Sequence, residues 1–190
     1  QTLADLKAVT SAADLTLLAA GLSPVSAAEL VLQKSATASR SAAEASLIIT
    51  LHGPRAEISL LKGSYVVFSH FTQVTGEGDA SDNQAVISAV ARSLMGLTGP
   101  VRSGDITQSY LLGSTDEFET LAPLVEKRVQ NSQLEILDPF DAPRITTDAA
   151  LPENRSAYAG LVGSLLAQSQ PLAVPIDFLS PRKPPVKPDH

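Results

Sequence analysis

The stretch that decides the fold runs from Leu47 to Thr72, LIITLHGPRAEISLLKGSYVVFSHFT, and predicts three consecutive strands. The first strand ends at the turn His52-Gly53-Pro54, and the turn Lys62-Gly63-Ser64 joins the second strand to the third. Glycine favours such turns because it adopts positive φ without a steric penalty. Short connections of this kind predict three antiparallel neighbours in one sheet.

The side chains of these strands predict which strand is central. The first strand is apolar on both faces, as expected of a strand that is covered on both sides. In the second strand Ala56, Ile58 and Leu60 share one face, and Glu57 and Ser59 point to the other. In the third strand we expect Val66, Phe68 and His70 on one face and Val67, Ser69 and Phe71 on the other, with His70 in a packed or edge position.

The composition limits the classes of function. The chain has 190 residues, 44% of them hydrophobic, which is enough for the core of one domain. Because it has no cysteine, it forms no disulfide, thiol nucleophile or cysteine-ligated zinc site. A net charge of -6 without a basic cluster argues against nucleic-acid binding. No apolar run approaches the roughly 20 residues of a transmembrane helix.

Before the three strands, the periodicity predicts a lead-in over residues 1–45. An apolar stripe predicts a helix from Leu3 to Ala20, with Gly21 as its C-cap. Val25–Leu32 fits either a strand or the start of a helix. The chain begins inside a predicted helix, so we expect it to be a fragment of a longer protein.

After the three strands, helices and strands alternate. Capping-box patterns at Ser81-x-x-Gln84 and Ser114-x-x-Glu117 predict two helix starts, and Pro123 predicts a kink or break in the second helix. We expect two further strands and a last helix rich in small residues that lets another backbone approach closely; their ranges are Asp105–Leu112, Leu134–Leu137 and Asn154–Gln168.

Several of these segments together resemble the actin-like ATPase fold. They are the three-strand unit, Ala89-Val-Ala-Arg-Ser-Leu94, Ser109-Tyr-Leu-Leu-Gly-Ser-Thr-Asp-Glu-Phe118 and Leu134-Glu-Ile-Leu-Asp-Pro-Phe140. Within that fold the chain is similar to the PilM family of type IV pilus assembly proteins and to the cytoplasmic part of GspL from type II secretion. The resemblance covers about residues 15–180. It implies an α/β fold of the actin-like or ribonuclease-H-like type, with a mixed sheet flanked by helices, corresponding to the second half of such a protein.

The resemblance also implies where a nucleotide would bind. Nucleotide-using members end the first strand in Asp-x-Gly, whereas this chain has Leu51, His52 and Gly53. A leucine cannot ligate Mg²⁺, which takes oxygen ligands. The two other family loops correspond to Gly76 with Gly78 and to Gly113 with Ser114. We therefore expect a degenerate cofactor site, no catalytic residue, no metal and no cofactor, with ATP as the alternative.

The residues after position 172 form a Pro-rich basic tail, residues 173–190, which we expect to link a half domain at 1–172 to a membrane span beyond His190. The segment Ile176-Asp-Phe-Leu-Ser-Pro181 is similar to the cytoplasmic start of PilN, the membrane partner of PilM. This implies that Ile176, Phe178, Leu179 and Pro181 bind a partner or dock on the chain itself. Basic residues beside a span predict the cytoplasmic face of the bacterial inner membrane.

Three hypotheses of function stay open at this point. The first is a non-catalytic actin-like scaffold of a pilus or type II secretion assembly platform that binds other assembly proteins. The second is a nucleotide-binding ATPase fragment of the actin and sugar-kinase superfamily, and the third is a generic adaptor domain. His52 is interpreted as a turn residue, because no partner for acid–base chemistry lies near it in sequence.

Overall fold

The computed structural model describes residues 3–16, 21–35, 44–74, 79–97, 102–142 and 150–169. The chain divides into two compact units, Gln1–Leu22 with Pro175–His190, and Ser23–Val174. In the first unit the structure describes helix α1 (Leu3–Ala12), none of whose residues is buried. No helix of the described residues is long and apolar enough to cross a membrane.

Helix α1 ends earlier than the apolar stripe predicted. Asp14 adopts a left-handed φ of 54°, and the N–H of Leu15 donates to the carbonyl of Thr10 at 2.8 Å. This pairing is that of a Schellman motif, which ends a helix by satisfying its last carbonyls. The prediction that the helix runs to Ala20, with Gly21 as its cap, is wrong for this reason.

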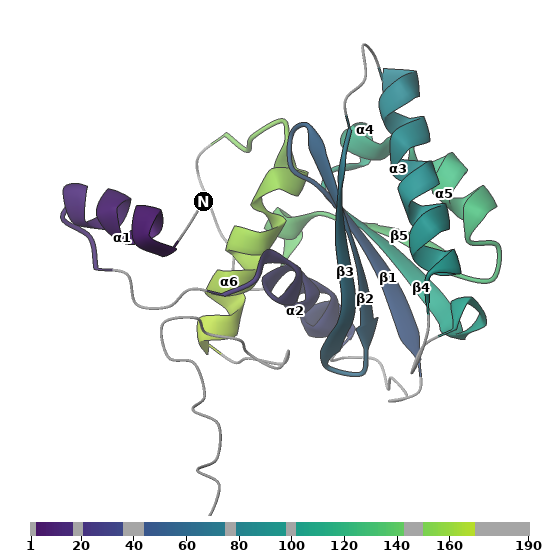
Figure 1. Cartoon of the computed structure of the whole chain (residues 1–190), viewed down its shortest axis with the longest axis horizontal. Helices are drawn as coiled ribbons and strands as arrows, with labels where there is room; N and C mark the ends of the chain where they lie inside the picture. The colour runs from purple at the N-terminus through teal and green to yellow at the C-terminus, as the bar shows by residue number, and fades with distance from the viewer. Residues whose placement is uncertain are drawn as a thin grey trace, which may run out of the picture. The chain divides into compact units, whose positions relative to one another are not determined.

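The unit Ser23–Val174 is built on one five-stranded mixed sheet (Figure 1). Its order is β3-β2-β1-β4-β5, with β1–β2 and β2–β3 antiparallel and β1–β4 and β4–β5 parallel. The predicted three-strand unit is confirmed, and its first strand is the central one. The strands are β1 (Ala45–Leu51), β2 (Arg55–Lys62), β3 (Tyr65–Gln73), β4 (Ile106–Leu112) and β5 (Gln133–Leu137).

Helices cover both faces of the sheet (Figure 1). One face packs against α2 (Ser23–Ser35) and α6 (Ala159–Ser169). The other packs against α3 (Asp79–Met95), α4 (Thr115–Phe118) and α5 (Ala122–Arg128). The strands supply both cores because β1 alternates between them: Leu47 and Ile49 enter one, and Ile48 enters the other. The predicted α/β class, with a mixed sheet flanked by helices, is confirmed.

The helix boundaries settle the remaining predictions. Val25–Leu32 is entirely helical, and Pro24 fits the first turn of α2 because those N–H groups have no partner within the helix. The capping box at Ser81 is wrong, since α3 begins at Asp79. The break at Pro123 is confirmed, with α5 starting at Ala122. The last helix starts later than predicted, after the 3₁₀ turn η3 (Arg155–Tyr158).

Helices α2 and α6 approach closely through small residues. A Cβ on Gly163 would lie 1.7 Å from the carbonyl oxygen of Ser26, and a Cβ on Gly160 would lie 3.0 Å from Ser23 Oγ. Ser164 Oγ donates to Ser26 Oγ at 2.9 Å between the same helices. The predicted packing role of these glycines is confirmed.

Candidate functional site

The parallel strands β1, β4 and β5 end at one edge of the sheet, where open α/β sheets bind their ligands. The sequence places two predicted site segments there, His52 with Gly53 after β1 and Gly113 with Ser114 after β4. The structure adds the 3₁₀ turn η3, which is bonded to the ends of β1 and β5 and to Glu117 of α4, next to the end of β4. This strand-end site is therefore the first place to test for a ligand.

At the end of β1, the backbone is bonded to η3. The N–H of Leu51 donates to Ser156 Oγ at 2.7 Å, and Ser156 is buried. The turn that follows is closed by the N–H of His52, which donates to the carbonyl of Arg55 at 2.7 Å. Gly53 has a φ of 57°, so the turn needs a residue that accepts the left-handed region.

At the end of β4, neighbouring side chains fill the space beside Gly113. A Cβ on Gly113 would lie 2.7 Å from both Glu117 Oε2 and Phe118 Cε2, and 3.0 Å from Ser156 Cβ. The N–H of Ser114 donates to Glu117 Oε2 at 2.7 Å, which confirms the predicted capping box. The same carboxylate accepts the N–H of Ser156, at 3.1 Å to Oε1.

At the end of β5, Asp138 contacts the turn η3 through Arg155. Arg155 forms an ion pair with Asp138, whose other carboxylate oxygen accepts the N–H of Phe140 at 2.9 Å. Hydrogen bonds thus join η3 to the ends of β1 and β5 and to Glu117, which caps Ser114 after β4. The charges of Asp138 and Arg155 compensate each other.

These contacts decide how well the site fits a magnesium nucleotide. Leu51 offers no ligand, Glu117 is engaged by two backbone N–H groups, and the side chains of Glu117 and Phe118 occupy the space beside Gly113. Within the described ranges no three His, Asp or Glu side chains gather as a metal site. The described residues of the strand-end site therefore do not fit a magnesium nucleotide. Gly76 and Gly78 lie outside the described residues, as do Ile176, Phe178, Leu179 and Pro181.

A buried carboxylate lies next to this edge and escaped the sequence analysis. Glu57 is 1% exposed, and its Oε2 accepts Ser23 Oγ at 3.0 Å and lies 3.3 Å from His52 Nε2. Ser59 Oγ donates to its Oε1 at 3.3 Å. The register of the predicted hairpin could have indicated this contact. Glu57 pairs with Thr50, so Glu57 lies within reach of His52, which follows β1. His52 lies at the turn after β1 as predicted, but the statement that no acidic partner lies near it is wrong.

No protein-family model and no curated protein matches the chain. Among solved structures, it is similar to a chain of the "PilM-PilN type IV pilus biogenesis complex", with a TM-score of 0.61 and 17% sequence identity. The match covers 89% of this chain and 57% of that chain. At this identity the similarity shows the fold, and the actin-like fold class predicted from the sequence is confirmed.

Replacing Gly113 with alanine is expected to destabilise the protein by about 2 kcal/mol, because the new methyl group collides with Glu117 and Phe118. Urea unfolding followed by circular dichroism measures this loss. Gly104→Ala is the matched control, since a Cβ at that position meets nothing within 4 Å. Equal stability of the two variants would show that the space beside Gly113 is not filled.

Proposed function

We propose that the chain is a non-catalytic, actin-like scaffold domain of a type IV pilus or type II secretion assembly platform, which acts by binding other assembly proteins. Its fold likeness to a chain of the PilM–PilN complex supports the class of machine. We place it on the cytoplasmic face of the bacterial inner membrane, as the basic tail suggests. The whole neighbour is longer, since this chain spans 57% of it.

The observation that most supports the scaffold role over the ATPase role is the closed strand-end site. In a nucleotide-using protein the carboxyl ends of parallel strands present backbone and acidic groups to the ligand. Here the N–H of Leu51 is bonded to Ser156, and Glu117 caps Ser114 and accepts the N–H of Ser156. These groups already have partners, so a nucleotide would have to displace η3.

Titration calorimetry of the whole chain with Mg-ATP tests the absence of nucleotide chemistry. We expect neither binding heat nor phosphate release at about 1 mM ligand, a concentration that detects affinities down to the millimolar range. Saturable binding that Gly113→Ala abolishes and Gly104→Ala leaves unchanged would establish the ATPase-type hypothesis instead. Thermal melts of each variant confirm that it is folded.

A second experiment separates the scaffold role from a generic adaptor. A two-hybrid assay pairs the chain with the pilus or type II secretion components encoded beside it, with and without Phe178→Asp in the tail. We expect an interaction that this change weakens at least tenfold. Failure to bind any such component would contradict the proposed machine.

A further inference from the structure

Strand β3 is an edge of the sheet, and among the described residues no strand pairs with its outer backbone groups. Its nine residues, YVVFSHFTQ, include no Lys, Arg, Asp, Glu, Pro or Gly. Natural edge strands are commonly protected by charges or proline, because an open edge pairs readily with another strand. High β-propensity without charge makes β3 competent to pair.

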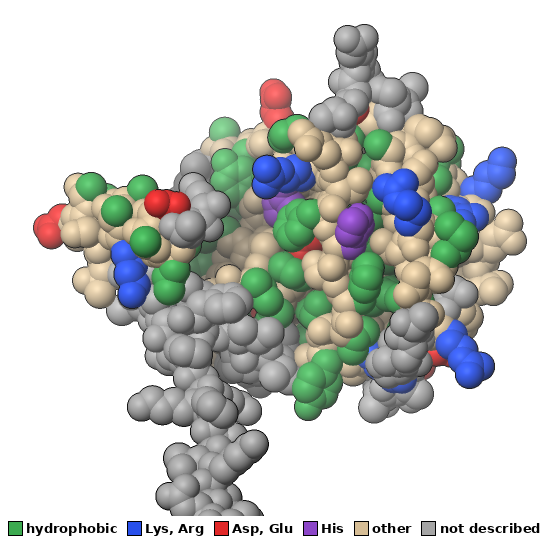
Figure 2. Space-filling view, in the orientation of Figure 1, with side chains coloured by type: hydrophobic (Ala, Val, Ile, Leu, Met, Phe, Trp, Pro, Cys, Tyr) green, Lys and Arg blue, Asp and Glu red, His purple; other side chains and the backbone are tan. Residues whose placement is uncertain are grey.

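Three of the six exposed side chains of β3 are large and apolar, and the other three are Ser69, His70 and Gln73. Tyr65 is 61% exposed, Val67 40% and Phe71 50%. Figure 2 shows hydrophobic side chains along the front of the molecule, over β3. A register shift between Leu60 and Leu61 leaves Val67 without a partner on β2 and puts Val66 and Phe68 on opposite faces, so the prediction that these two share a face is wrong. Beyond this bulge, Phe68–Gln73 is a regular segment.

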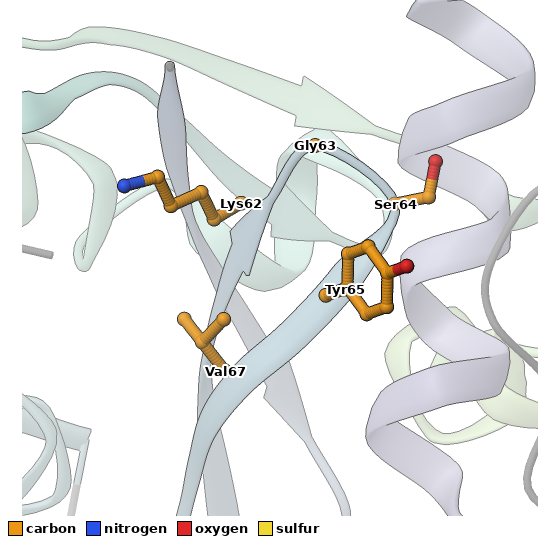
Figure 3. A pocket seen from close by; sticks show the side chains of 5 residues that line it. All are labelled: Lys62, Gly63, Ser64, Tyr65 and Val67. Atoms are coloured by element: carbon orange, nitrogen blue, oxygen red, sulfur yellow. The ribbon is translucent and has the colours of Figure 1, made fainter. Parts of the chain in front are cut away.

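A pocket adjoins the hairpin end of this edge. It has a volume of about 420 Å³ and is lined by Lys62, Gly63, Ser64, Tyr65 and Val67. Figure 3 shows the side chains of Tyr65 and Val67 projecting from β3 beside the tight turn. In strand addition, backbone hydrogen bonds supply the affinity and such pockets accept particular side chains.

We propose that the β3 edge pairs antiparallel with the β3 edge of a second copy of this chain, about a two-fold axis. If Ser69 lies opposite its own copy, the segment Phe68–His70 pairs with itself, and Phe71 of each copy falls beside the bulge at Val67 of the other. The half-exposed ring then lies against the wall of the partner's pocket, and the contact occurs twice. Self-complementarity of this kind is what a two-fold interface requires.

The charges around β3 are compatible with a second copy. Each copy carries a net charge of -6 and repels another across most surfaces, whereas β3 contributes no charge. The nearest exposed charge is Arg55, which pairs with Gln73 on the neighbouring strand. It would lie three strand spacings, about 14 Å, from Lys62 of the second copy, beyond the roughly 10 Å over which salt leaves exposed charges interacting.

The expected dimer is weak. Stable interfaces bury about 1,600 Å² in total, and the edge of one strand supplies less. Sedimentation velocity of the whole chain from roughly 10 to 500 μM, a range suited to micromolar affinities, should show a monomer–dimer equilibrium. Phe71→Lys should weaken it at least tenfold, since edge lysines block strand pairing. The control Leu161→Lys changes a 58% exposed leucine on α6 and should leave it unchanged.

A cross-link tests the register. The chain has no cysteine, so Ser69→Cys introduces a single thiol, placed opposite its copy at the Cα separation that a disulfide accepts. Mild oxidation should give covalent dimers of Ser69→Cys well above those of Leu161→Cys. A monomer at every concentration, equal effects of both lysine changes, or no excess cross-link would overturn the proposal. A dimer lost only with Leu161→Lys would assign the interface to α6 instead.

Discussion

Replacing Gly163 with alanine is expected to unfold the protein or to cost more than about 3 kcal/mol, beyond the usual cost of overpacking. The new Cβ would lie 1.7 Å from the carbonyl oxygen of Ser26, an atom of the α2 backbone that no side-chain rotation can move. The two helices would have to separate, exposing the apolar contacts of Ala28, Val31 and Val162. Urea unfolding, or the soluble yield if no folded protein is obtained, measures the effect.

Gly160→Ala on the same helix is the matched control. Its Cβ would meet Ser23 Oγ at 3.0 Å, a side-chain atom that can shift by the small distance required while it still donates to Glu57. Alanine also favours a helix over glycine by roughly 0.5–1 kcal/mol, so the net change should be small. If both variants lost the same stability, the close approach of Gly163 to Ser26 would not be what sets the cost.

Replacing Glu57 with alanine is expected to destabilise the protein by about 3 kcal/mol. The carboxylate is buried, and its loss removes the acceptor of Ser23 and Ser59 and the charge beside His52. Buried polar groups left without partners cost their full desolvation free energy. Chemical unfolding at neutral pH measures the change, and Glu57→Gln, which keeps the shape and an acceptor oxygen, should lose less.

The control for Glu57 is a glutamate in an exposed ion pair. Glu135 lies 2.8 Å from Lys34 Nζ with 38% of its side chain exposed, so Glu135→Ala should cost less than about 1 kcal/mol. A similar small loss for Glu57→Ala would mean that the buried hydrogen bonds contribute nothing to stability.

Local pattern was sufficient to predict the sheet. Turns at Gly53 and Gly63 and the two-sided apolar run of β1 identify three neighbouring strands with the first one central. The break at Pro123 also follows from one residue. The end of α1 does not, because it depends on the left-handed conformation of Asp14, which aspartate adopts only occasionally.

The strand-end site could be predicted only in part. Sequence analysis placed His52, Gly53, Gly113 and Ser114 in loops. It did not show that Ser156 lies beside both loops, because Ser156 is 105 residues from Leu51 in the chain. A serine that accepts one backbone N–H leaves no pattern in the sequence. Glu57 was assigned to the correct face by alternation, but its burial depends on α2, whose Ser23 donates to it.

The pairing of α2 with α6 has a consequence for synthesis of the chain. Ser26 and Ser164, which join the two helices, are 138 residues apart. At 5–20 residues per second, a ribosome needs about 7 to 28 s to make the intervening segment. For that time the part of α2 that packs on α6 has no partner, although the hairpins of β1, β2 and β3 can already close and cover part of its apolar side. We therefore expect nascent chains that stop before residue 159 to depend on chaperones.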